Sequence, residues 1–115
     1  MSIEHKKKIL VMMSTFNGEK YLKEQIDSIL NQKTEHEVYL QIRDDGSRDR
    51  TCEIVTEYIS KYPGKITFSK GGNLGYNASF FQLINAAGGY DYYSISDQDD
   101  IWLDDKLHVA CNSID

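Results

Sequence analysis

Apolar residues along the chain follow two spacings, one typical of buried strands and one typical of amphipathic helices. Ile9 to Met13 is a continuous apolar run, which favours a strand covered on both faces in a parallel sheet. Apolar side chains then recur every three or four residues between Glu19 and Gln32, as in a helix with one buried face. The sequence therefore predicts a strand followed by a helix at its start.

The same alternation continues to residue 96. It predicts strands over 38–42, 66–69 and 92–96, separated by helices around 55–62 and 80–87 that end at Pro63-Gly64 and Gly88-Gly89. A β-α-β-α-β-α-β order implies parallel strands, because right-handed crossovers carry the helices over the two faces of the sheet. We predict an α/β fold with an open, mostly parallel Rossmann-like sheet and helices on both faces.

The chain has the length and composition of one folded domain. Its 115 residues are 40% apolar and 27% charged and include one proline, which is typical of globular and not of disordered proteins. A domain of this size buries roughly 65% of the surface of its unfolded chain. Because no repeat, low-complexity tract or linker interrupts the pattern, we expect residues 1–115 to form a single domain.

Polar segments follow three of the predicted strands. They are Ser14 to Asn17, Asp44 to Asp49 and Ser96 to Asp100. Ligands of open parallel sheets bind outside the carboxyl ends of the strands. We therefore expect these three segments to face one crevice that holds the candidate site.

The sharpest chemical signal is the cluster Asp97-Gln98-Asp99-Asp100 at the end of the fourth strand. Three carboxylates in four positions repel one another unless a cation or hydrogen-bond donors compensate, and Mg²⁺ or Mn²⁺ binds through carboxylates together with the phosphates of a substrate. A solvated turn or helix N-cap is the structural alternative. An EF-hand is excluded, since Trp102 stands at its glycine position and His108 at its final glutamate position.

The second acidic segment, Asp44 to Asp49, supports two interpretations. Its glycine, its serine and its last aspartate are typical of a tight turn with a helix cap. A carboxylate at the mouth of a parallel sheet also accepts hydrogen bonds from a base or ribose. We favour this second role for Asp45 and weigh the two roles evenly for Asp44.

Two further features carry weaker signals. The glycine-rich segment Gly71 to Asn77 allows close backbone approach, but its spacing matches neither a Walker A motif nor GxGxxG. Tyr90, Tyr92 and Tyr93 beside the fourth strand are expected in the core, because aromatic side chains next to a strand usually pack there.

The net charge excludes one class of partner. The formal charge is −5 and the pI about 5.1, so the basic surface that binds nucleic acid is absent and no nucleic-acid partner is expected. Residues 91–105 contain six aspartates and neither lysine nor arginine, a charge of −6. The acidity of the chain is therefore concentrated at the end of the fourth strand.

The sequence also bears on compartment and redox chemistry. No apolar run approaches the roughly 20 residues that span a bilayer, and no cleavage site follows Lys6-Lys7-Lys8. Cys52 and Cys111 are far apart and lack CxxC spacing, which argues against a zinc site or a disulfide framework. We expect a cytoplasmic protein with inert thiols.

Four motifs taken together resemble the family 2 glycosyltransferases of the GT-A fold. They are Val11 to Gly18, Ile42 to Thr51, Asn73-Leu74-Gly75 and Ser96 to Trp102. The resemblance covers nearly the whole chain in the right order, and the Ser-Asp-Gln-Asp-Asp-Ile-Trp motif is most similar to the rhamnosyltransferase-type members that build bacterial surface polysaccharides. It implies that the chain is the GT-A nucleotide-binding half.

The resemblance implies a nucleotide-sugar-binding set of residues. Ser14 and Asp45 match positions that hold the uracil or thymine nucleotide of the donor, with Thr15 and Asp44 beside them. Asn73, from the third motif, is assigned to the same set.

The resemblance also implies a metal site. Asp97 and Asp99 match the DxD pair, which contacts the ribose and a divalent metal, Mn²⁺ or Mg²⁺, on the diphosphate. Asp100 is the adjacent third candidate ligand. The metal would neutralise charge that develops on the leaving diphosphate.

The activity implied is transfer of a sugar from a UDP- or dTDP-sugar, dTDP-rhamnose included, to a glycan or lipid-linked acceptor. Full-length members continue with acceptor-binding elements and a carboxylate that serves as general base. None of Asp104, Asp105 or Asp115 matches that base by motif. We expect the base beyond Asp115 and no sugar transfer by residues 1–115 alone. We also expect peripheral association of the longer protein with the inner face of the membrane. Self-association of residues 1–115 through an exposed apolar face is expected as well.

Two other classes of function remain as alternatives. One is a catalytically silent module that binds a nucleotide or carbohydrate. The other is a phosphoacceptor receiver-like domain, suggested by acidic clusters on an α/β sheet. The receiver is disfavoured because its acidic pair should follow the first strand, where this chain has Ser14-Thr15.

Overall fold

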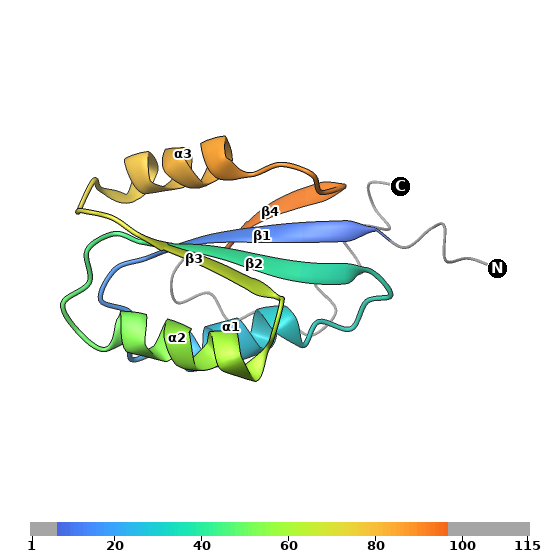
Figure 1. The fold of residues 1–115 in the computed structure, drawn as a ribbon, viewed down its shortest axis with the longest axis horizontal. Helices are drawn as coiled ribbons and strands as arrows, with labels where there is room; N and C mark the ends of the chain where they lie inside the picture. The colour runs from blue at the N-terminus through green and yellow to red at the C-terminus, as the bar shows by residue number, and fades with distance from the viewer. Residues whose placement is uncertain (1–6, 97–115) are drawn as a thin grey trace.

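Strands and helices alternate along the chain in a computed structural model that describes residues 7–96. The elements are β1 (Lys8–Thr15), α1 (Leu22–Leu30), β2 (Glu37–Asp44), α2 (Thr51–Lys61), β3 (Ile66–Lys70), α3 (Tyr76–Ala86) and β4 (Tyr92–Ser96). This order, drawn in Figure 1, confirms the predicted α/β class.

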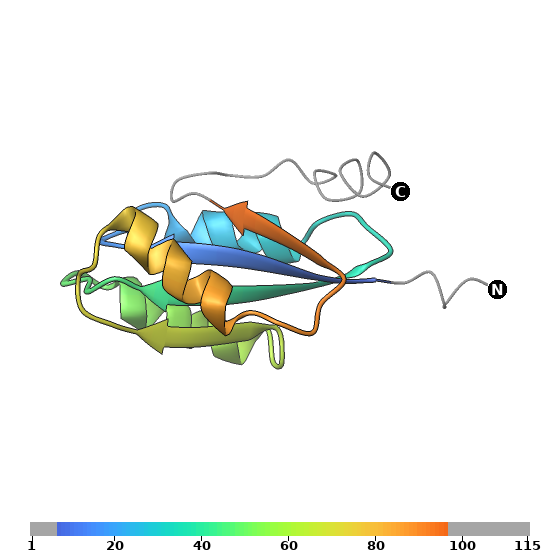
Figure 2. The ribbon, with the colours of Figure 1, turned by 90° about the horizontal axis from the view of Figure 1, so that it is seen from above.

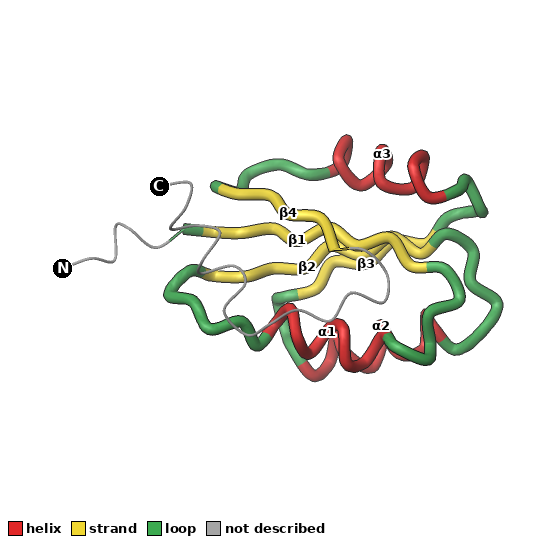
Figure 3. Tube along the Cα trace, turned by 180° about the vertical axis from the view of Figure 1, so that it is seen from behind, coloured by secondary structure: helices red, strands yellow, loops and turns green. Residues whose placement is uncertain are grey.

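The described strands form one parallel sheet in the order β3-β2-β1-β4. Helices α1 and α2 cover one face, and α3 lies on the other, as Figures 1 and 3 show. The chain progresses from β1 through β2 to β3 on one side and then returns across the sheet to place β4 on the other side of β1. The order of strands therefore reverses beside β1, and open α/β sheets bind ligands at such a reversal.

The two faces of the sheet are packed unequally. Alternate residues of β1 point to opposite faces, so Ile9, Val11 and Met13 join α1 and α2 while Leu10 and Met12 join α3. Among residues 7–96, the core under α1 and α2 contains twelve buried apolar residues, and the core under α3 contains four. Most of the hydrophobic stabilisation therefore comes from the α1 and α2 side.

Two strands run further than the apolar pattern predicts. β1 continues beyond Met13 to Thr15, and β2 continues to Asp44, with Ser14 paired to Arg43 and Thr15 paired to Asp44 in the parallel ladder. Polar side chains are accommodated here because each of them has a hydrogen-bond partner. Ser14, Thr15 and Asp44 are thus the last residues of strands and not loop residues.

The helix boundaries also differ from the periodic pattern. α1 begins at Leu22 instead of residue 19, because a turn closes first, with Tyr21 N–H donating to the Gly18 carbonyl. α2 begins at Thr51, whose backbone N–H donates to the Asp49 carboxylate at 3.0 Å. Polar groups at the helix starts, which apolar periodicity does not register, set these boundaries.

The prediction that all three tyrosines near β4 are core residues is wrong for Tyr93. Tyr90 and Tyr92 are half-buried and pack against the two cores, but Tyr93 is 46% exposed. Tyr93 lies on the α3 face of the sheet, and α3 packs mainly over β1 and β2. Figure 2 shows α3 crossing the sheet beside β4.

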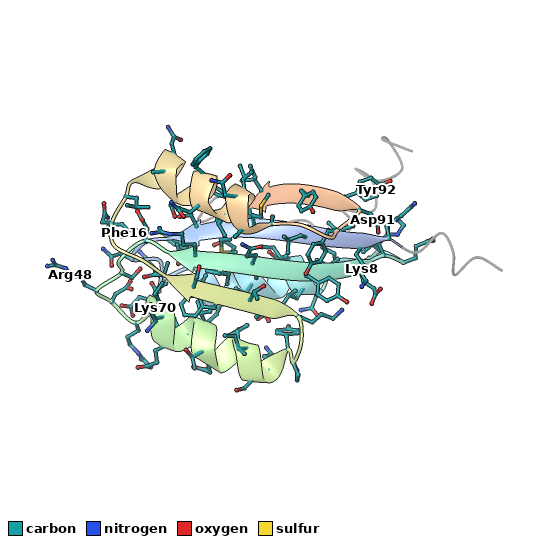
Figure 4. All side chains as sticks on the ribbon, turned by 45° about the horizontal axis from the view of Figure 1, so that its top comes forward. Lys8, Phe16, Arg48, Lys70, Asp91 and Tyr92 are labelled. Carbon is teal, nitrogen blue, oxygen red and sulfur yellow. The ribbon has the colours of Figure 1, made fainter. Side chains whose placement is uncertain are left out.

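The sheet has two chemically different ends. In Figure 4, Lys8, Asp91 and Tyr92 mark the end where β1 and β4 begin, and Phe16, Arg48 and Lys70 mark the end where β1, β2 and β3 finish. The predicted site residues Ser14, Thr15, Asp44 and Asp45 all belong to this second end. Within residues 7–96, no helix is both long and apolar enough to cross a membrane.

Candidate functional site

A set of buried polar side chains occupies the carboxyl ends of β1 and β2. Ser14, Thr15, Asp44 and Asp45 are each less than 10% exposed. Among the described residues, no buried side-chain nitrogen or oxygen lacks a hydrogen-bond partner. The sheet end is therefore a fully paired polar network, which holds its side chains in fixed positions.

The first part of this network faces α1 and α2, and we call Thr15, Asp44 and Ser47 the α1/α2-side cluster. One Asp44 oxygen, Oδ1, accepts from the Thr15 hydroxyl at 2.9 Å and from the Ser47 hydroxyl at 2.6 Å. The other, Oδ2, accepts from the backbone N–H groups of Gly46 at 3.2 Å and Ser47 at 2.8 Å. Four donors thus use the acceptor capacity of this carboxylate.

The α1/α2-side cluster also joins the loops that follow β1 and β2. Asn17, the one described non-glycine residue at positive φ, donates its N–H to the Ser47 hydroxyl at 2.8 Å. Its side-chain oxygen accepts the N–H of Arg48 at 2.9 Å, and Gly18 N–H donates to the Thr51 hydroxyl at 2.9 Å. The two loops therefore form one rigid rim on this side of the sheet.

Cys52 lies next to this cluster. Burial, and then the neighbouring Asp44 carboxylate, raises the pKa of the Cys52 thiol. A thiol with a raised pKa stays protonated at neutral pH and is a weak nucleophile. This agrees with the expectation of an inert thiol at this position.

The second part of the network faces α3, and we call Ser14, Arg43, Asp45 and Ser79 the α3-side cluster. The Arg43 guanidinium donates through Nη1 to Asp45 Oδ1 at 2.6 Å and to Ser79 Oγ at 2.9 Å. Ser79 Oγ lies 2.6 Å from Ser14 Oγ. These bonds connect the ends of β1 and β2 to the first turn of α3.

Asp45 receives two further bonds from the segment that precedes α3. Leu74 N–H donates to its Oδ1 at 2.9 Å, and Gly75 N–H donates to its Oδ2 at 3.0 Å. Burial raises the pKa of the Asp45 carboxyl, but the Leu74 N–H, the Arg43 guanidinium and the Gly75 N–H outweigh it, so the pKa lies below its ordinary value. Asp45 is therefore an ionised carboxylate at neutral pH.

The structure brings Asn73 to the same edge. The backbone of Asn73 lies against Gly46, where an added Cβ would approach Asn73 N to 3.2 Å, and Gly46 has a φ of +90°. The Asn73 residue itself is exposed. The segment 71–75 and the turn after β2 are thus neighbours, with the Asn73 residue open to solvent.

Arg43 and Ser79 are two members of the network that the sequence interpretation missed. Arg43 is a charged residue inside a strand whose other late positions are buried, and such a charge requires a partner. That pattern was the available signal for Arg43. Ser79 carried no comparable signal, because serine near the start of a helix is common.

The acidic cluster Asp97, Asp99 and Asp100 lies outside the described residues. The residue before it, Ser96, is buried at the end of β4, pairs with Met13 in the ladder, and accepts a hydrogen bond from the Gln25 amide at 3.1 Å. Ser96 thus lies at the same edge as the polar network. Within residues 7–96, no group of three or more histidine, cysteine, aspartate or glutamate side chains is arranged to hold a metal ion.

Comparison with known proteins identifies the family. The family model described as Glycosyl transferase family 2 matches residues 10–115. The chain belongs to this family. Its parallel sheet is therefore the fold of a family 2 glycosyl transferase.

Two relatives of this family 2 chain have names that state a dTDP-rhamnosyl transfer and a part in teichoic acid biosynthesis. One is the dTDP-rhamnosyl transferase RfbG of Shigella flexneri, 40% identical over 108 residues, which cover 89% of this chain and 36% of RfbG. The other is the minor teichoic acid biosynthesis protein GgaB of Bacillus subtilis, 33% identical over 106 residues, which cover 91% of this chain and 12% of GgaB. The chain therefore spans about a third of RfbG and less of GgaB.

A solved structure confirms the GT-A type architecture. The crystal structure of S. aureus TarS 1–349 in complex with UDP superposes with a TM-score of 0.76 at 29% identity, covering 93% of this family 2 chain and 32% of TarS 1–349. The fold predicted from the sequence is therefore confirmed, and the UDP belongs to TarS.

Proposed function

We propose that this chain is the donor-binding part of a glycosyltransferase that transfers a sugar from a UDP- or dTDP-sugar, with dTDP-rhamnose as the leading candidate. The acceptor is a glycan or a lipid-linked glycan in bacterial surface polysaccharide synthesis. Membership of family 2 and the similarity to RfbG and GgaB support this proposal. The observation that carries it is the convergence of Ser14, Thr15, Asp44 and Asp45 at one edge of the sheet.

Of the two aspartates, Asp45 is the one we assign to direct nucleotide binding. Among the contacts of the described residues, Asp45 Oδ1 accepts two hydrogen bonds and Oδ2 accepts one, so Oδ2 retains an acceptor position. An N–H or O–H donor of a base or ribose is the partner that this position suits. Asp44, whose oxygens accept four bonds, shapes the pocket.

For the metal we retain Asp97, Asp99 and Asp100 as candidate ligands for Mn²⁺ or Mg²⁺. Carboxylate oxygens are the ligands that these hard cations prefer, and the segment follows Ser96 at the switch edge of the sheet. A bound divalent cation supplies charge neutralisation for the leaving diphosphate. The residues of β1 and β2 then hold the nucleoside end of the donor.

We also propose that the longer protein works in the cytoplasm and associates peripherally with the inner face of the membrane. The support is chemical, because a lipid-linked acceptor is held at a membrane surface. We propose that the general base and the acceptor region lie beyond Asp115, since none of Asp104, Asp105 or Asp115 matches the base by motif. Fractionation of the full-length protein with and without high salt tests the membrane association, and a salt-insensitive cytosolic protein contradicts it.

Calorimetric titration of the chain with UDP and with dTDP, each with and without Mn²⁺, tests donor binding. We expect saturable binding of at least one nucleotide that tightens with Mn²⁺, and tightening that is lost in Asp99→Asn. Asp91→Asn is the matched control, because Asp91 is an exposed aspartate at the opposite end of the sheet. Absence of binding by either nucleotide contradicts the donor role.

A second candidate function is a catalytically silent module that binds a nucleotide or carbohydrate. The fully paired network favours neither candidate, because it positions a nucleotide equally well for binding and for transfer. Incubation of the full-length protein with a labelled nucleotide-sugar and candidate acceptors separates them. Transfer by the full-length protein excludes the silent module, and transfer by residues 1–115 alone contradicts our placement of the base.

A further inference from the structure

The Arg43 guanidinium of the α3-side cluster touches three separate segments. Besides Asp45 and Ser79, its guanidinium donates through Nη2 to the Gly72 carbonyl at 3.2 Å. These partners lie after β2, in α3 and in the segment between β3 and α3. A planar guanidinium with several N–H donors suits such a junction, because its geometry allows simultaneous bonds in fixed directions.

Asp45 and Arg43 both bind the backbone of the segment 71–75. Arg43 binds the Gly72 carbonyl, and Asp45 accepts the N–H groups of Leu74 and Gly75. Both charged side chains are buried and 2.6 Å apart. A buried charge without its partner is costly. Displacing the segment 71–75 therefore disturbs the Arg43–Asp45 ion pair, and breaking the ion pair frees the segment.

Gly71 provides the space that this junction requires. A Cβ added at Gly71 would stand 2.0 Å from Arg43 Nη2 and 2.8 Å from Arg43 Cζ. The guanidinium would have to shift, which disturbs the geometry of its bonds to Asp45, Ser79 and Gly72. At Gly88, by contrast, an added Cβ meets nothing within 4 Å.

We propose that Arg43 is a positioning residue for the donor nucleotide: it fixes the Asp45 carboxylate and the segment 71–75 as one wall of the crevice, and Gly71 is required because it leaves room for the guanidinium. This inference rests on the proposed function, since it assigns the wall to the donor site. A wall fixed before binding raises affinity, because less ordering is required when the nucleotide binds.

The primary test is Gly71→Ala, with Gly88→Ala as the matched control. Gly71→Ala leaves every polar side chain of the cluster present and displaces the guanidinium only. In calorimetric titration with UDP and with dTDP in Mn²⁺, we expect Gly71→Ala to weaken binding about tenfold and Gly88→Ala to leave the Kd within about twofold of the original. The fitted stoichiometry reports the folded fraction, so loss of fold is separated from loss of affinity.

A second comparison isolates Arg43 itself. Arg43→Lys keeps a cation beside Asp45 but loses the planar guanidinium, whose N–H groups bond Ser79 and Gly72 at the same time. We expect Arg43→Lys to weaken nucleotide binding, and Gly71→Ala to cause little further weakening in that background, because the shorter ammonium leaves the space open. Independent, additive losses in the two variants contradict the inference.

Amide hydrogen exchange without nucleotide separates this inference from the donor role. We expect Gly71→Ala to speed exchange at the Leu74 and Gly75 amides, which donate to Asp45, and Gly88→Ala to leave their rates unchanged. If the unmodified chain binds nucleotide but Gly71→Ala changes neither Kd nor exchange, the positioning role is overturned. If the unmodified chain binds no nucleotide, the donor role fails while the exchange result still reports on the junction.

Discussion

The two adjacent aspartates at the end of β2 belong to clusters that are held together differently. In the α1/α2-side cluster, three of the four donors to Asp44 come from Gly46 and Ser47, within three residues of it. In the α3-side cluster, the Leu74 and Gly75 amides that bind Asp45 are 29 and 30 residues away, and Arg43 supplies a charge. Asp44 organises its own turn, whereas Asp45 fastens a distant segment to the sheet.

This difference separates two roles that look alike in the sequence. A carboxylate surrounded by neutral local donors makes a turn, and its acceptor positions are filled before any ligand arrives. A carboxylate held by an arginine and by distant amides links separate segments at the end of the sheet and keeps an acceptor position on Oδ2. We therefore propose shape for Asp44 and ligand contact for Asp45, and three stability experiments test how differently the two carboxylates are held. A fourth experiment concerns the apolar surface on the α3 side.

The largest effect is expected from Asp45→Ala. Removing this carboxylate leaves the Arg43 guanidinium buried without an anionic partner, which costs about 3–5 kcal/mol in the free energy of unfolding. Urea denaturation measures the loss. The double variant Arg43→Met, Asp45→Ala is the control, because it removes both charges and should recover most of the stability. A double variant no more stable than Asp45→Ala contradicts the buried-pair explanation.

A smaller loss is expected from Asp44→Ala. Its backbone donors at Gly46 and Ser47 are half-buried and can bind water instead, while the buried Thr15 hydroxyl loses its acceptor. We expect a loss of about 1–3 kcal/mol, measured by the same urea denaturation. Thr15→Val removes one donor and no carboxylate, so it should cost less than Asp44→Ala. If Asp44→Ala lowers the free energy of unfolding more than Asp45→Ala does, the proposed difference between the two carboxylates is contradicted.

The pH dependence of stability sharpens the contrast at Asp45. Its folded-state pKa is lowered below the unfolded value of about 3.9, so its contribution is fully present above that value and is lost as pH falls through the folded pKa. We expect urea midpoints to fall in acid, and to fall less steeply in the Arg43→Met, Asp45→Ala variant. Parallel pH profiles for the two proteins contradict an ionised, paired Asp45.

The smallest effect concerns the apolar surface on the α3 side. Phe81, Ile84 and Tyr93 are 62%, 49% and 46% exposed, and Met12, Ile84, Ala87 and Tyr93 line a cavity of about 420 Å³. We predict weak self-association of the chain through this surface. Tyr93→Ser should weaken association in sedimentation velocity and change stability by less than about 0.5 kcal/mol. A chain that sediments as a monomer at high concentration contradicts the prediction.

Much of the fold follows from local patterns. A continuous apolar run predicted β1, and the three-to-four residue spacing predicted the three helices, because each element must bury at least one face. The element ends were less predictable, since Ser14, Thr15 and Asp44 continue strands through side-chain pairing that periodicity does not register. The exposure of Tyr93 depended on which strands α3 covers, a tertiary property.

The sequence by itself determined the α/β class, the family and the three strand-end segments that carry polar chemistry, because all of these depend on local spacing and motif order. The tertiary structure decided which of the paired aspartates has its acceptors filled, and it revealed Arg43, which also bonds Ser79, as a support of Asp45. The reason is that hydrogen bonds between Asp45 and the segment 71–75 join residues about thirty positions apart, and a linear pattern does not show which distant donors meet.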